Sequence, residues 1–173
     1  MSKRQREVAK KTWDIGNIFS VELSDGTFSI GQVVGREAEV LNSITCAFFK
    51  VRFQHYPSMD EIFELNDTKL IACQFTTKDL LTKRIWKVLG NRKPVISTIS
   101  FPHEDCRDNG WIGAEMHGSG IMNQFLNAYY ALEFWDDWFE PDYLDTILWK
   151  HAKKPENLRY KLPLNKLLNP DSP

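Results

Sequence analysis

The sequence predicts an α+β fold, in which a strand-rich first part packs against helices near the C-terminus. Segments between residues 18 and 53 alternate apolar and polar side chains with the two-residue period of strands. From Ile121 onward the apolar period becomes that of a helix. Strands come first and helices last, without a strand–helix–strand rhythm. We therefore expect a bent antiparallel sheet or a small barrel, covered on one side by the C-terminal helices.

The first elements are predicted to form a β-hairpin. One face of a strand over residues 18–23 collects Phe19, Val21 and Leu23. The pair Asp25-Gly26 is a hairpin turn signal, so a return strand is expected over residues 27–34. Gly31 inside that strand indicates a bulge or a close approach of another group to the backbone.

Between this hairpin and the C-terminal helices, the sequence predicts a series of shorter elements. Further strands are expected over residues 44–53, 70–75, 86–89, 95–99 and 111–116. The pair Gly90-Asn91 is interpreted as the turn between the third and fourth of these. A helical turn is expected over residues 77–81 and a polar loop over 103–110.

Two helices are predicted near the C-terminus. Helical spacing relates the apolar residues Ile121, Phe125, Ala128, Leu132 and Trp135. Ser119 is the expected N-cap of this first helix. Pro141 is expected to open a second, short helix. Its inner face would hold Tyr143, Leu144, Ile147 and Leu148.

Composition indicates a single domain of 173 residues with a formal net charge of −1. We expect a basic tail over residues 1–11, one domain over 12–150 and a C-terminal tail over 151–173. The near-neutral charge gives no general attraction to nucleic acid or to anionic membranes. No apolar segment follows the basic start as in a signal peptide, and no run is long enough for a membrane span. The odd number of cysteines, three, favours reduced thiols in the cytoplasm.

The block from Gly118 to Trp149 contains acids and aromatic residues but no Lys or Arg. Such a surface suits a basic protein partner, because acids steer association and aromatic side chains provide buried contact area. The candidate contact residues are Asp136, Asp137, Trp138, Glu140, Asp142 and Asp145. A solvated acidic turn between two helices is an equally good interpretation. Phe125, Tyr129 and Trp135, at helical spacing, are expected in the core.

Other kinds of site find weaker support in the sequence. His103, Cys106 and His117 suggest a small hydrolase, but no paired metal-ligand spacing and no orienting third group accompany them. The basic stretch from Lys78 to Lys93 suggests a nucleic-acid-binding module, but no base-reading motif is present. We therefore expect no catalytic residues, no metal and no cofactor, and keep both alternatives open.

Three stretches of the chain resemble one family. They are Trp13–Gly26 with Phe28 and Gly31–Val33, then Trp86–Asn91, and finally Phe125–Leu132 with Trp135–Asp137 and Pro141–Asp145. Together they are similar to the immunity protein 26 family of bacterial polymorphic toxin systems, over roughly Trp13 to Trp149. Asn17 and Glu133-Phe134 depart from the pattern, the latter just before the acidic block.

The resemblance implies a non-enzymatic, cytoplasmic immunity protein that binds and silences a cognate toxin domain in the producing cell. Many toxic domains are basic nucleases, and an acidic face would suit such a partner. The resemblance identifies neither the toxin nor the part of it that is bound, and leaves the oligomeric state of the chain open.

Overall fold

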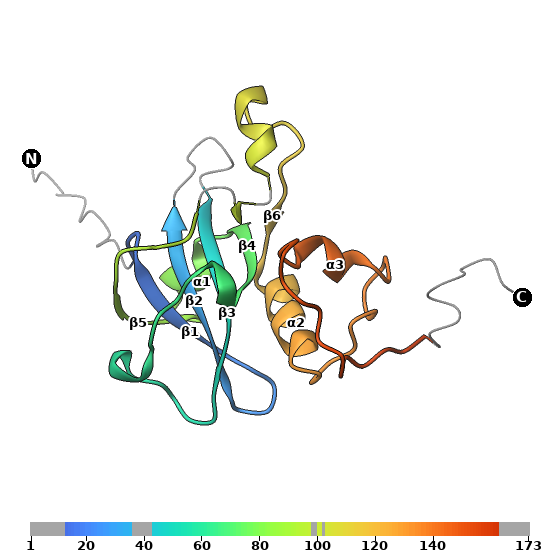
Figure 1. Ribbon diagram of the computed structural model, residues 1–173, viewed down its shortest axis with the longest axis horizontal. Helices are drawn as coiled ribbons and strands as arrows, with labels where there is room; N and C mark the ends of the chain where they lie inside the picture. Colours follow the sequence, from blue (N-terminus) through green and yellow to red (C-terminus); the bar gives the residue numbers. More distant parts are fainter. Residues whose placement is uncertain (1–12, 36–42, 98–99, 102, 163–173) are drawn as a thin grey trace, which may run out of the picture.

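The computed structural model describes residues 13–35, 43–97, 100–101 and 103–162. Its centre is a six-stranded sheet in the order β5-β1-β2-β3-β4-β6 (Figure 1). The strands are β1 (Asn17–Glu22), β2 (Phe28–Gly35), β3 (Ile44–Phe53), β4 (Leu70–Thr76), β5 (Lys87–Asn91) and β6 (Met116–His117). Neighbours pair antiparallel except β4 and β6, which are parallel. The α+β prediction is confirmed, with a mixed sheet that does not close into a barrel.

The predicted hairpin is present as β1 and β2, which pair in register with Val21 opposite Ser29. The backbone N–H of Leu23 donates to the carbonyl of Thr27 at 2.8 Å and closes the turn. The close approach predicted at Gly31 is also found. A side chain there would collide with the ring of Phe19, which stacks on Trp86 with 4.9 Å between ring centroids.

Both faces of the sheet are covered, so the protein has two apolar clusters. On one face Phe19, Val21 and Phe48 pack with the helical residues Phe125 and Leu126. The opposite face holds a second set of buried side chains, which includes Ile18, Ile30, Phe49, Phe75, Phe101 and Trp111. This division follows from the strand period, which sends successive side chains to opposite faces.

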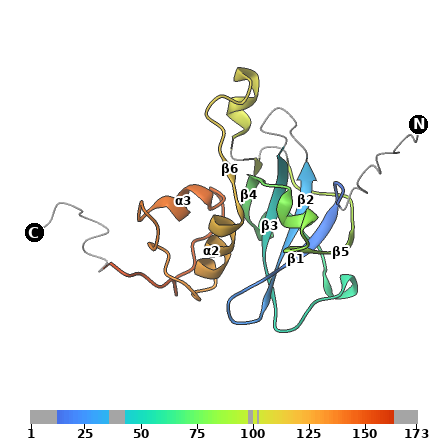
Figure 2. The ribbon, with the colours of Figure 1, turned by 180° about the vertical axis from the view of Figure 1, so that it is seen from behind.

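Two α-helices follow the sheet in sequence, as predicted, and lie together on one side of it in both views (Figures 1 and 2). They are α2 (Ser119–Tyr129) and α3 (Tyr143–Ile147). Before them, the described residues contain α1 (Asp79–Thr82) and the 3₁₀ helices η1 (Met59–Glu61), η2 (Asp67–Lys69) and η4 (Glu104–Asn109). The helical turn near residue 79 is therefore confirmed, and the expected loop over 103–110 is mostly 3₁₀ helix.

Helix α2 is shorter than its apolar stripe predicted. It ends at Tyr129, and Ala131 adopts a left-handed conformation with φ of +59°. The chain therefore turns away, and Trp135 reaches the core from outside the helix. Its N-cap is Gly118, one residue before the predicted Ser119.

Helix α3 starts at Tyr143, with Asp142 as its N-cap, so Pro141 lies before the helix. Leu144 and Ile147 are buried, as expected of an inner face. Tyr143 and Leu148 are only partly buried and pack at the margin of the same cluster.

One turn prediction and two strand predictions were wrong. The pair Gly90-Asn91 is not a turn but the end of β5, and the absence of a side chain at Gly90 lets Met59 pack against it. Residues 95–97 form no strand, while Ile99 lies outside the described residues. Of the strand predicted over residues 111–116, only Met116 belongs to β6, because the chain turns at Trp111 with φ of +63°.

After α3 the chain continues as an irregular segment, which contacts β4. The backbone N–H of Trp149 donates to the carbonyl of Ile71 at 2.7 Å. The amide of Gln74 donates to the carbonyl of Ile147 at 3.1 Å. Further along, Leu158 and Tyr160 pack against the helical side of the core. The predicted basic tail over residues 1–11 lies outside the described residues, as does the chain beyond 162.

Candidate functional site

All but one of the candidate residues lie in the connection between α2 and α3, and the exception, Asp145, lies in α3. We call residues 136–142 the acidic loop. Trp135 anchors its start, because this indole is buried and its ring nitrogen donates to Asp145 at 3.1 Å. The backbone N–H of Trp135 also donates to the carbonyl of Arg159 at 2.8 Å. The loop is therefore held between the core and the C-terminal segment.

Asp136 serves this attachment and is not available to a partner. Only 5% of Asp136 is exposed, and its two carboxylate oxygens accept separate hydrogen bonds. The donors are the backbone N–H groups of Lys161 at 2.6 Å and Leu162 at 2.7 Å. A carboxylate satisfied by backbone donors in a buried place stabilises the loop itself.

Two further candidate acids are exposed but already paired with lysines. Asp137 lies 2.6 Å from the ammonium of Lys161, and Asp145 lies 2.5 Å from that of Lys154. Ion pairs at this exposure contribute little to stability, because water and salt screen them. Cationic side chains of a partner would therefore displace these lysines at a small cost in free energy.

The other candidates, Trp138, Glu140 and Asp142, face solvent. Within the described residues, neither Glu140 nor Asp142 has an ion pair. Trp138 is 42% exposed and stacks on Tyr143 with 5.7 Å between ring centroids. That contact holds one face of the indole and leaves the other accessible.

Phe139 is a further exposed aromatic residue, which the list of sequence candidates omitted. Its side chain is 96% exposed, the highest value among the large exposed apolar residues of the described chain. Exposing a whole phenyl ring forgoes the stabilisation that its burial would bring. The sequence signal was its position between acids and directly before Glu140-Pro141, where neither helical stripe reaches it.

The local electrostatics of the loop are consistently negative. Burial raises the pKa of Glu133, and the nearby charge of Asp137 raises it further. Burial also raises the pKa of Tyr143, to which Glu115 and Glu140 add. Nearby acids thus raise the pKa values of both Glu133 and Tyr143, which flank the acidic loop.

The hydrolase alternative finds no assembled site. His117 is 4% exposed, and its Nε2 atom lies 3.4 Å from the hydroxyl of Tyr143 and 3.8 Å from Glu115. Burial lowers the pKa of His117. No group of three His, Cys, Asp or Glu side chains in the described chain is placed to hold a metal. Cys46, Cys73 and Cys106 are free thiols, and burial raises the pKa of Cys46 to about 12, which disfavours a reactive thiolate.

The basic stretch from Lys78 to Lys93 lies on α1, β5 and their flanks. Several of its cations have contacts within the protein. Lys83 pairs with Asp79 at 3.3 Å, and the guanidinium of Arg92 donates to the carbonyl of Ile62 at 2.9 Å. Such partners are expected of an outward sheet face, and none of them indicates readout of nucleic-acid bases.

A comparison with known families bears on these interpretations. A family model described as immunity protein 26 matches residues 14–108. The chain belongs to the immunity protein 26 family. The matched span contains β1 to β5 and most of η4. No curated protein and no solved structure matches the chain.

The acidic loop lies after the matched span of the immunity protein 26 family, although the resemblance noted from the sequence extended to Trp149. In this member the matched part forms most of the sheet, and the loop is attached to it through α2 and the C-terminal segment. None of the helices in the described parts of the chain is long and apolar enough to cross a membrane.

Proposed function

We propose that this protein is a non-enzymatic immunity protein of the cytoplasm, which binds a cognate toxin domain through the acidic loop and silences it. Membership of the immunity protein 26 family supports the role. The exposure of Phe139 beside Trp138 supports the location, because two adjacent aromatic side chains in water are the kind of anchor that a protein interface buries.

Charge indicates the kind of partner. Among the described residues, the loop presents Glu140 and Asp142 without ion pairs, and Asp137 with one exposed lysine. A basic surface on the toxin, such as that of a nuclease domain, would complement these acids. The formal net charge of −1 gives no long-range attraction, so this local patch must supply the steering. Binding at the active site of the toxin and binding beside it both fit this chemistry.

The test is co-expression with the toxic domain encoded beside this protein. We expect the immunity protein to restore growth and to form a stoichiometric complex on size-exclusion chromatography. Phe139→Ala should weaken that complex by roughly 2 kcal/mol, mainly through faster dissociation, if the ring is a central anchor. Surface plasmon resonance with the purified toxin domain measures both rates.

The matched control is Phe63→Ala. Phe63 is also highly exposed, at 79%, but lies next to η1, at the end of the molecule away from α3. Its loss should leave binding unchanged. Equal weakening by both variants, or by neither, would move the interface away from the acidic loop. Failure of the wild-type protein to bind or protect would reject the immunity role itself.

A further inference from the structure

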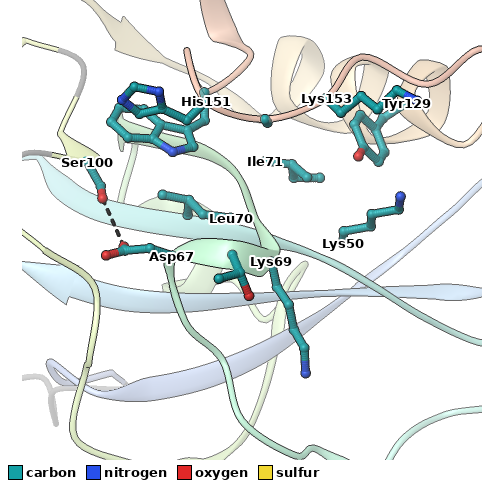
Figure 3. Close-up of a pocket in the computed structure, with 12 residues that line it drawn as sticks. Lys50, Asp67, Lys69, Leu70, Ile71, Ser100, Tyr129, His151 and Lys153 are labelled. Atoms are coloured by element: carbon teal, nitrogen blue, oxygen red, sulfur yellow. Dashed lines mark hydrogen bonds between the residues drawn. The ribbon is translucent and has the colours of Figure 1, made fainter.

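A basic groove lies on a part of the molecule that the acidic loop does not use. Strand β3 continues beyond its last partner on β4, because Leu70 pairs with Phe49 and β4 begins at Leu70. The C-terminal segment after Trp149 passes over the place where β3 extends beyond β4 (Figure 1). A cavity of about 450 Å³ remains between them, lined at its strand side by Lys50 and Lys69 (Figure 3).

A second cavity, of about 370 Å³, continues the first. The two share Lys50, Tyr129 and Lys153, and the second adds Arg52 and Lys154. We call the combined space the basic groove. Five Lys and Arg side chains line it, against the two acids Asp67 and Glu156. A concave surface lined by one sign of charge concentrates ions of the opposite sign.

Three of the five cations already have partners. Arg52 forms an ion pair with Asp25, Lys154 lies 2.5 Å from Asp145, and the ammonium of Lys69 donates to the carbonyl of Glu64 at 2.8 Å. Lys50 and Lys153 are therefore the cations that a ligand would meet.

Asp67 accepts hydrogen bonds from the hydroxyl of Ser100 at 2.9 Å and from the backbone of Ser97 at 3.3 Å. Glu156 pairs with Lys153 in a highly exposed contact, which a competing anion would replace at little cost. Lys50 has no ion pair within the described residues.

The groove combines cationic, hydroxyl and apolar side chains. Figure 3 shows Lys50 reaching from the strand side toward Tyr129, with Lys153 beside Tyr129 on the opposite wall. Burial raises the pKa of Tyr129, so its hydroxyl remains a hydrogen-bond donor. Leu70, Ile71 and Trp149 provide an apolar wall in the same cavity. Ligand sites commonly combine an apolar lining with a few convergent polar groups.

We propose that the basic groove binds a small organic anion. Its phosphate or carboxylate group lies between Lys50, Lys153 and the hydroxyl of Tyr129, and its apolar part lies against Leu70, Ile71 and Trp149. This site is separate from the acidic loop and goes beyond the proposed immunity function. Lysines suit it because an ammonium group binds such oxygens as a point charge, without the fixed geometry of arginine.

The experiment is calorimetric titration of the purified full chain at near-physiological salt with four probes. Phenyl phosphate and phenylacetate carry both features of the ligand. Inorganic phosphate lacks the apolar part, and benzyl alcohol lacks the charge. We expect phenyl phosphate or phenylacetate, whichever anion the site prefers, to bind more tightly than inorganic phosphate and benzyl alcohol.

Variants locate that binding. Lys50→Ala and Lys153→Ala should each weaken it about tenfold, as expected for one lost charge-assisted contact. Lys93→Ala is the matched control, because Lys93 is exposed, carries the same charge and lines neither cavity. All three residues are exposed lysines, so equal unfolding midpoints should show intact folding. Lys50→Gln serves as a second test if Lys50→Ala fails to fold.

Several results would overturn the proposal. They are the absence of a heat of binding for both anions, binding of benzyl alcohol as tight as theirs, and equal weakening by Lys93→Ala and Lys50→Ala. Loss of toxin binding in the groove variants, with no effect on small anions, would instead make the groove part of the protein interface. Toxin protection measured beside the titrations keeps the two proposals independent.

Discussion

Asp136 shows how one buried carboxylate fixes the position of a surface loop. Its oxygens bind two consecutive backbone N–H groups of a segment that lies 25 and 26 residues later in the chain. The neighbouring Trp135 binds the same segment through its backbone. Because these contacts join the loop to the C-terminal segment, the exposed residues that follow, Trp138 and Phe139, start from a defined position.

Replacement of Asp136 by Ala should therefore loosen the segment and lower the free energy of unfolding. Two backbone donors would lose a charged acceptor, and the expected loss is about 1–3 kcal/mol. Urea denaturation measures the total, and amide hydrogen exchange at Lys161 and Leu162 locates it. Glu140→Ala is the control, since Glu140 is exposed in the same loop. Unchanged exchange at these two amides in Asp136→Ala would contradict the assigned role.

At the scale of elements, the sequence predicted best where neighbouring residues alone determine the structure. The hairpin was confirmed because the Asp25-Gly26 turn and the alternation of Phe19, Val21 and Leu23 act within a few residues. Strand β5 was misjudged because Gly90 accommodates Met59, a contact between distant residues that no local pattern reveals. Helix α2 was extended too far because apolar spacing continues past Ala131, where the backbone turns left-handed.

The candidate site was likewise predicted only in part. Trp138 was a predicted contact residue and is exposed, and so is Phe139, which the candidate list omitted. Asp136 was grouped with the contact acids because its donors belong to residues 161 and 162, which no spacing in the acidic block indicates. The basic groove was not predicted at all, since it forms where β3, α2 and the C-terminal segment meet.

The packing of β6 against α3 introduces a pH dependence into the fold. His117 of β6 is buried beside Tyr143 of α3, and its Nδ1 atom has no hydrogen-bond partner in the described structure. Burial lowers the pKa of His117 and nearby His103 lowers it further, while Glu115 opposes the shift. In the unfolded chain a histidine titrates near ~6.5. Between the lowered folded value and ~6.5, the unfolded state binds more protons than the native state.

The stabilisation from neutral His117 is therefore complete above about pH 6.5 and is lost as the pH falls through that range. We expect a lower free energy of unfolding at mildly acidic pH than at neutral pH, measured by urea denaturation. His117→Met should remove this part of the dependence, because methionine does not titrate. His151→Met, at an exposed histidine, should retain it. The same slope in His117→Met and in wild type would assign the effect to other groups.

On the scale of the whole molecule, charge is distributed unevenly over a nearly neutral protein. The sheet separates two apolar clusters, and the helical side holds both the acidic loop and one wall of the basic groove. The lysines that pair with Asp137 and Asp145 belong to the C-terminal segment, so this segment moderates the negative patch. The proposed binding to a basic toxin would then depend on the location of the acids, and not on the total charge.

Two charge reversals of equal size test this dependence on location. Glu140→Lys with Asp142→Lys alters the acidic loop, and Asp60→Lys with Glu64→Lys alters exposed positions in and near η1, at the other end of the molecule. Both double variants raise the formal net charge equally. The loop variant should associate with the toxin more slowly, by about tenfold or more, and its association rate should vary less with ionic strength. The η1 variant should keep most of the wild-type rate. Stopped-flow association kinetics over a salt series measures both effects. Equal slowing in the two variants would show that net charge, and not the acidic loop, steers the encounter.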